Sequence, residues 1–281
     1  MTPEFSEFTY GFALTNELLS WIPISAVPIF PSLIEEGRDG GGYDVNLDAP
    51  GIPIYLQFKR ADCMIRSTAR ECSHPHANLS PPFYRFKITE ARRSPQHQML
   101  LSLDNGENIV QYVAPRFHTH AEINAAWRRG GIASQSIFVA PSQIGTLDDN
   151  PHYVAYDSTQ AYVFSEPKSV QFLAAAELIA EISNRLDKSK QPLEKALPIR
   201  RRELRSAIEE GARADSYEAI GFTQRALAAR RVPVASYDPE IPLDQRTAKT
   251  LSGPKAILRE MADDALKFLS SQLVVVQSNS G

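Results

Sequence analysis

The chain has 281 residues, 43% of them hydrophobic and 22% charged, which is ordinary for a globular protein and allows one large domain or a domain with a smaller appendage. The formal net charge of −3 excludes a strongly basic protein, so contact with nucleic acid would need a local patch. No apolar run predicts a membrane span, and the N-terminus lacks the pattern of a signal peptide. We therefore expect a cytoplasmic protein whose two cysteines are reduced.

The opening of the chain predicts one helix followed by three strands. Apolar residues recur near helical spacing in residues 8–22, a helix that carries Glu17. The segment "ISAVPIF" predicts an edge strand because of its prolines. Next, the turn "DAPG" connects "YDVNL" at 43–47 to "IPIYLQFK" at 52–59, and the three together predict a tight hairpin.

The middle of the chain mixes helices and strands. Residues 61–94 predict an inserted loop, because they are rich in proline and only "YRFKI" alternates. A helix begins at Ser94 as N-cap, with Pro95 at its first position. After it the sequence predicts a strand at 109–115, a helix at 117–127, a strand at 136–141 and a hairpin at 152–167.

Beyond Pro167 the composition shifts towards helices. Apolar residues form one helical stripe in 169–186, and further helices are predicted at 192–210, 216–231 and 254–273. We therefore expect an α/β core at residues 1–166, followed by a helical C-terminal region at 167–281.

Three polar side chains converge if the predicted hairpin forms. Successive side chains of a strand point to opposite faces, so Gln57 and Lys59 share one face with Tyr55. Pairing with 43–47 can bring Asp44 to the same face. Carboxylate and amide oxygens are ligands for Mg²⁺, and a nearby ammonium stabilises negative charge or positions a water. The pattern predicts phosphate chemistry.

At these residues the chain resembles the PD-(D/E)XK, or restriction-endonuclease-like, nucleases, and most closely their Mrr-type branch. The matching residues are Gly41, Gly42, Tyr43 and Asp44, followed by Gln57, Phe58, Lys59 and Arg60. The order of helix and strand over 94–117 also agrees, so the likeness covers roughly residues 8–127. The resemblance implies an α/β fold with a mixed central sheet flanked by helices.

The resemblance also implies roles for these residues. Asp44 would be a metal ligand, Gln57 would supply a side-chain oxygen, and the backbone carbonyl of Phe58 would be a further ligand. Lys59 would assist the attack of water on the scissile phosphate. The acid of the first helix would be Glu17, with Glu36 as its rival; these acids matter more because an amide such as that of Gln57 binds Mg²⁺ more weakly than a carboxylate.

The implied activity is hydrolysis of phosphodiester bonds in DNA with Mg²⁺ or Mn²⁺, in prokaryotic anti-phage or restriction-type defence. RNA is a possible substrate, because the motif contacts the phosphodiester and not the sugar. Cutting both strands usually needs two active sites, so we expect a homodimer or a part of a defence complex. The alternatives are a regulatory or nucleic-acid-binding subunit of such a complex without its own catalysis, and a structural protein.

Other residues are candidates for contacts with nucleic acid. Arg60 and Gln96 flank the predicted site, and arginines in one stretch of a predicted helix could hold several phosphates. These arginines are Arg200, Arg201 and Arg202. Glutamates lie close to them, so a solvated, salt-bridged surface is an equal alternative.

Two clusters of cysteine and histidine have weaker patterns. Cys63, Cys72, His74 and His76 carry zinc-ligand chemistry, but their spacing matches no standard zinc module, and free loop residues are the alternative. A further pair, His118 and His120, precedes a predicted helix, where capping or solvent roles are expected.

Overall fold

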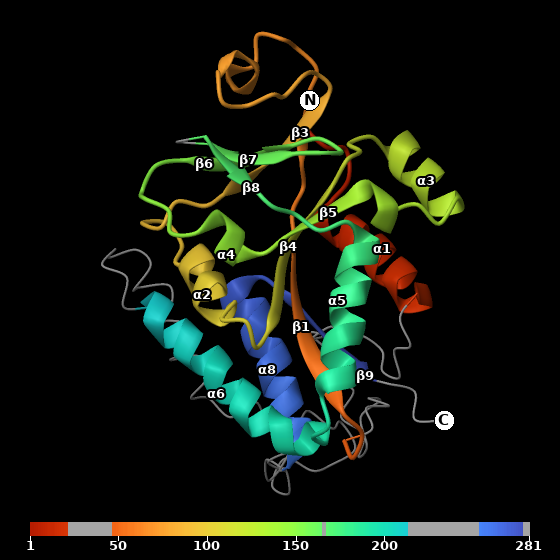
Figure 1. The fold of residues 1–281 in the computed structure, drawn as a ribbon, viewed down its shortest axis with the longest axis vertical. Coiled ribbons are helices and arrows are strands. Elements are labelled where there is room, and N and C mark those ends of the chain that lie inside the picture. Colours follow the sequence, from red (N-terminus) through yellow and green to blue (C-terminus); the bar gives the residue numbers. More distant parts are fainter. Residues whose placement is uncertain (22–46, 165–166, 213–252, 278–281) are drawn as a thin grey trace, which may run out of the picture.

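The computed structural model describes residues 1–21, 47–164, 167–212 and 253–277. Within these residues the strands form two sheets, a mixed sheet in the order β5-β4-β1-β9 and an antiparallel sheet in the order β2-β3-β6-β7-β8 (Figure 1). Helices flank the mixed sheet, so the expected α/β class is confirmed. Among the described helices, none is long and apolar enough to cross a membrane.

The mixed sheet is the centre of the fold. Its strands are β1 Gly51–Phe58, β4 Ile109–Pro115, β5 Ser136–Val139 and β9 Gln272–Gln277. β1 is parallel to β4 and antiparallel to β9, and β5 pairs antiparallel with β4. Nearly all residues of these strands are buried, as expected for a sheet that is covered on both faces.

Helices cover the two faces of the mixed sheet (Figure 1). One face packs against α2 Gln96–Leu103, α6 Leu193–Ala212 and α8 Pro254–Leu269. The other face packs against α1 Glu7–Trp21 and α5 Ala175–Lys188. The remaining described helices are α3 His120–Arg128, α4 Pro141–Ile144 and two 3₁₀ turns, η1 Arg70–Ser73 and η2 Ala133–Gln135.

The antiparallel sheet lies beyond the end of β1. Its strands are β2 Asp62–Met64, β3 Phe83–Ile88, β6 His152–Tyr156, β7 Ala161–Phe164 and β8 Lys168–Val170. The predicted strand in "YRFKI" and the hairpin of β6 and β7 are confirmed. Residues 61–94 are more than a loop, because β2 and β3 form one side of this sheet. The Tyr156 hydroxyl links the sheets by donating to the carbonyl of Pro115 at 2.7 Å.

The C-terminal region is part of the central sheet, which corrects the predicted division near residue 166. The helix expected at 254–273 ends at Leu269, and the apolar run after it forms β9 beside β1. β8 likewise pairs with β7 across that boundary. The predicted helix at 216–231 and the strand at 24–30 lie outside the described residues.

The expected tight hairpin is also corrected. β9 pairs with β1 from Gly51 to Leu56, and β4 occupies the other edge from Ile54 to Phe58. Before β1, the carbonyl of Ala49 accepts from the N–H of Leu193 at the start of α6, at 2.9 Å. Residues 43–46 lie outside the described part.

Because Leu273 of β9 is buried in the core, Leu273→Ala should lower the free energy of unfolding by about 2–5 kcal/mol. Leu266 of α8 is 47% exposed, so Leu266→Ala should change it by no more than about 0.5 kcal/mol. Urea denaturation of the full chain measures both. Equal effects of the two substitutions would show that β9 is not part of the cooperative core.

Candidate active site at the end of the central strand

The last residues of β1 carry polar side chains towards α2. Ile54 and Leu56 pack in the core on the α1 and α5 face, whereas Tyr55 packs with α2, α6 and α8. The predicted alternation along β1 is therefore confirmed, and it directs Gln57 and Lys59 to the Tyr55 side.

Within the described residues, Gln57 is held by one end of its amide. Its side chain is 2% exposed, and its Nε2 donates to the Oε1 of Gln96 in α2 at 2.5 Å. The Oε1 of Gln57 is buried and has no hydrogen-bond partner in the described part of the chain. An unpartnered buried acceptor typically costs about 1–3 kcal/mol, so this oxygen is suited to a ligand that supplies the missing partner.

Lys59 follows directly after β1 and is half-buried. Its backbone N–H donates to the carbonyl of Val113 at 2.8 Å, which extends the pairing of β1 with β4. Its ammonium lies 5.5 Å from the centre of the Tyr112 ring, a distance suited to a cation–π contact. Burial lowers the pKa of Lys59, and the charge of Glu7 opposes this shift.

Tyr112 lies next to Gln57 and Lys59, and His97 packs against Tyr112. The Nε2 of His97 lies 2.8 Å from the carbonyl oxygen of Gly145, so Nε2 carries the proton. Its Nδ1 then accepts from the hydroxyl of Tyr112 at 2.8 Å. Burial lowers the pKa of His97, and the charges of His152 and Lys59 lower it further, which keeps the ring neutral. These bonds fix the start of α2 and therefore the position of Gln96.

Glu17 does not join Gln57 and Lys59. Its buried carboxylate accepts from the backbone N–H groups of Ile132 at 2.7 Å and Ala133 at 3.2 Å. Glu7, in the first turn of the same helix, lies by the site instead and accepts from the backbone N–H of Arg60 at 3.4 Å. The separation of ten positions between the two acids corresponds to about 15 Å along a helix. Helical periodicity could not show which turn meets β1.

The other expected metal ligands are only partly described. Asp44 and Glu36 lie outside the described residues. Phe58 lies between Gln57 and Lys59, with its ring against Tyr10 on the opposite face at 5.9 Å. No group of three or more His, Cys, Asp or Glu side chains in the described ranges could hold a metal ion. In that part of the chain, the Oε1 of Gln57 is a side-chain oxygen of this site that has no hydrogen-bond partner.

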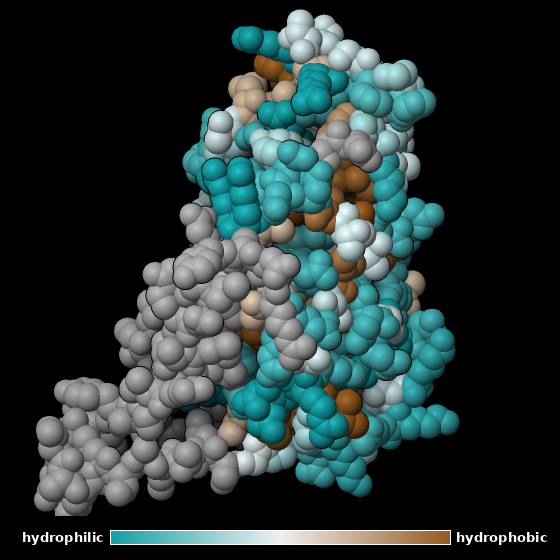
Figure 2. Space-filling view, turned by 90° about the vertical axis from the view of Figure 1, so that its left-hand side faces the viewer, coloured by the Kyte–Doolittle hydropathy of each residue, from teal (hydrophilic) through white to brown (hydrophobic). Residues whose placement is uncertain are grey.

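The candidate nucleic-acid contacts divide into two groups. Arg60 is exposed at the site, and Gln96 is bonded to Gln57. Three others, Arg200, Arg201 and Arg202, lie on α6, away from the site. Figure 2 shows the side of the molecule on which α2 and α6 lie in Figure 1; its coloured surface is mostly hydrophilic, with several hydrophobic patches.

Two of the α6 arginines are already paired. Arg200 forms ion pairs with Glu107 and Glu203, and Arg201 with Glu260. Arg202 is exposed. Because Glu107 precedes β4 and Lys59 lies at the far end of that strand, Arg200 is roughly 15 Å or more from Lys59. The salt-bridged surface is therefore the correct description of Arg200 and Arg201.

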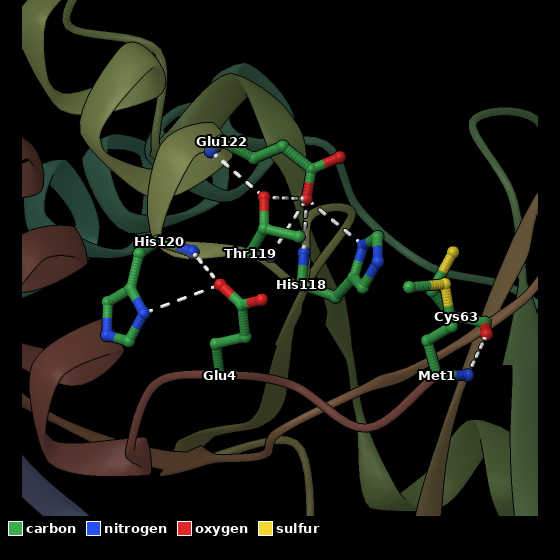
Figure 3. A network of polar contacts seen from close by, with 7 residues as sticks. All are labelled: Met1, Glu4, Cys63, His118, Thr119, His120 and Glu122. Atoms are coloured by element: carbon green, nitrogen blue, oxygen red, sulfur yellow. Dashed lines mark hydrogen bonds and ion pairs between the residues drawn. The ribbon is translucent and has the colours of Figure 1, made fainter.

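Thr119 and Glu122 cap α3, and the two histidines beside Thr119 join the same polar network (Figure 3). The carboxylate of Glu122 accepts from the backbone N–H of Thr119 at 2.9 Å and lies 3.0 Å from Nδ1 of His118. His120 pairs with Glu4 at 3.4 Å. Cys63 is buried in β2, and its carbonyl accepts from the α-amine of Met1.

Comparison with known proteins adds no further constraint on this site. No protein-family model, no curated protein and no solved structure matches the chain. A functional proposal therefore rests on the geometry around Gln57 and Lys59 and on the sequence pattern that contains them.

The buried carboxylate of Glu17 has a structural role, so its removal should affect stability and spare the chemistry at Lys59. Glu17→Ala leaves two backbone donors without their acceptor and should lower the free energy of unfolding by about 2–3 kcal/mol. Glu17→Gln keeps one acceptor oxygen and should lose less. Chemical denaturation measures both, and an unchanged stability of Glu17→Ala would contradict the assignment.

Lys59 should make stability depend on pH. Because burial lowers its pKa below the ordinary value of 10.5, the unfolded chain binds more protons between the two values. The free energy of unfolding of the wild type should therefore rise, relative to that of Lys59→Met, as pH increases from neutral towards 10.5. Urea denaturation of both proteins across this range measures the difference. If the free energy of unfolding of the wild type relative to Lys59→Met stays constant or falls as pH rises, the amine is not buried.

Proposed function

We propose that this protein is a metal-dependent DNA endonuclease that hydrolyses phosphodiester bonds, acting in prokaryotic anti-phage or restriction-type defence. The observation that carries the proposal is the unpartnered, buried Oε1 of Gln57, on the same face of the β1 segment as the amine of Lys59. This is the pair that the resemblance to Mrr-type nucleases assigns to the active site.

The described residues fit a hard divalent cation in part. The Oε1 of Gln57 is a neutral oxygen ligand without a competing hydrogen bond, the donor type that Mg²⁺ and Mn²⁺ accept. Asp44 would supply the carboxylate and Phe58 a carbonyl, as the resemblance implies. When bound, the cation would supply a Lewis acid for the phosphate and lower the pKa of a bound water.

Lys59 has the properties that phosphodiester hydrolysis requires. Its ammonium, held near the Tyr112 ring, can stabilise negative charge that develops on the phosphate. Burial lowers the pKa of Lys59 towards neutral pH, and a group that titrates closer to neutral pH can more readily take a proton from water or return it. Gln96 fixes the orientation of the Gln57 amide, so the oxygen and the amine keep a constant spacing.

An aromatic surface on α1, the helix that carries Glu7, could hold the substrate. Phe8 and Phe12, one turn apart on α1, are 73% and 54% exposed, and Phe12 stacks on Trp127 with ring centres 6.1 Å apart. Sequence reasoning missed these residues, because exposed aromatic side chains share the helical spacing of a buried stripe. Such rings stack on unpaired bases, and the exposed Arg60 lies close by for a phosphate.

The activity should depend on the amine of Lys59. Lys59→Met keeps the length of the side chain and removes its charge, so DNA cleavage with Mg²⁺ or Mn²⁺ should fall by about a hundredfold to ten-thousandfold. Lys195→Ala, an exposed lysine on α6, should leave the rate unchanged. The measurement is conversion of supercoiled plasmid, with circular dichroism as the check of folding.

Two results would contradict the nuclease proposal. Equal cleavage by the wild type and Lys59→Met would place the chemistry elsewhere. The absence of cleavage by the wild type, on DNA or RNA and with either cation, would favour a nucleic-acid-binding or regulatory subunit instead.

A further inference from the structure

A cavity lies at the end of β4 away from Lys59, on the sheet face opposite the candidate active site. Its volume is about 410 Å³, within the range of about 300–1,000 Å³ that is usual for small-molecule sites. Its walls come from the start of β4, the end of β5, residues 171–173 and α5. The side chains used in the argument below are Gln111, Phe138, Glu181 and Arg185.

Gln111 is a cavity-lining residue whose side-chain amide has an unsatisfied oxygen. The residue is 4% exposed, and its Oε1 is buried without a hydrogen-bond partner in the described part of the chain. The neighbouring β4 residues Ile109 and Val113 have their side chains in the apolar core on the same face. An amide in such a place is costly unless a ligand pairs with it, because its desolvation is otherwise uncompensated.

The backbone of β4 adds a donor and an acceptor at the same point. The carbonyl of Val113 faces β1, where it accepts from Lys59, so by alternation the backbone groups of Val110 face the other edge. β5 covers that edge only from Tyr112 onwards. Val110 lines the cavity, and its N–H and C=O lie side by side at the edge that β5 leaves uncovered.

The charges of the cavity walls disfavour an anion. Arg185 is paired with Glu181 at 2.6 Å and also donates to the carbonyl of Gly106 at 2.9 Å. Asp104 adds a second carboxylate to the lining and accepts from the N–H of Ser142. The lining therefore offers two carboxylates and one guanidinium that is already engaged, a balance suited to an uncharged ligand.

We infer that this cavity binds a small, planar, uncharged ligand with neighbouring N–H donors and acceptors, of the class of a nucleobase or nucleoside. The amide of Gln111 pairs with one edge of the base, as side-chain amides pair with adenine. The backbone of Val110 offers a further donor and acceptor, and the ring of Phe138 forms an apolar wall. The inference rests on this cavity alone and does not depend on the proposed nuclease.

Calorimetric titration of the full chain with adenosine, guanosine, cytidine and uridine tests the inference. We expect at least one nucleoside to bind with a Kd below the millimolar range, and its 5′-monophosphate to bind at least about tenfold more weakly. Failure of all four nucleosides to bind, or binding of the monophosphate as tight as that of the nucleoside, would overturn the inference.

Variants of Gln111 show where the nucleoside binds. Gln111→Leu, nearly equal in volume, should weaken binding at least about tenfold without lowering the melting temperature, because it removes an unpaired buried acceptor. Gln111→Met serves as a second variant should the first fail to fold. The exposed Gln191→Leu is the matched control and should bind as the wild type does. Unchanged binding by a folded Gln111 variant would overturn the inference.

Discussion

The parallel pairing of β1 with β4 is the interaction on which the rest of the structure depends. Parallel neighbours require a crossover connection, and here the chain between them contains β2, β3 and α2. The crossover brings α2 against the end of β1, where Gln96 meets Gln57. The same pairing extends to Lys59 through the carbonyl of Val113. The candidate active site is therefore a consequence of the central strand pair.

Burial on both faces explains how a lysine and an amide can be kept at the end of that strand. The helices on the Tyr55 side exclude water from Gln57 and lower the pKa of Lys59. β9 completes the sheet on the other edge of β1, so the C-terminal segment is needed for the same core. The packing around β1 that stabilises the core therefore also buries Gln57 and Lys59.

The alternation of side chains along 52–59 could be predicted from the sequence, because it depends only on the two-residue period of a strand. The sequence did not predict that β9 pairs with β1, because the two strands are far apart in the sequence and no local pattern indicates their pairing. The four apolar residues Leu273–Val276 could equally end a helix by periodicity alone. The sequence named Glu17 as the acid of the first helix and did not point to Glu7, since the spacing of a helix does not determine which turn meets the strand.

The most direct test of the account is a crystal structure of the full chain soaked in Mn²⁺, with anomalous scattering used to locate the ion. The account predicts an anomalous peak within coordination distance of the Oε1 of Gln57, shared with the carboxylate of Asp44 and close to Lys59. A well-ordered Gln57 whose Oε1 is hydrogen-bonded to another protein group, with no anomalous density beside it, would contradict the proposed site.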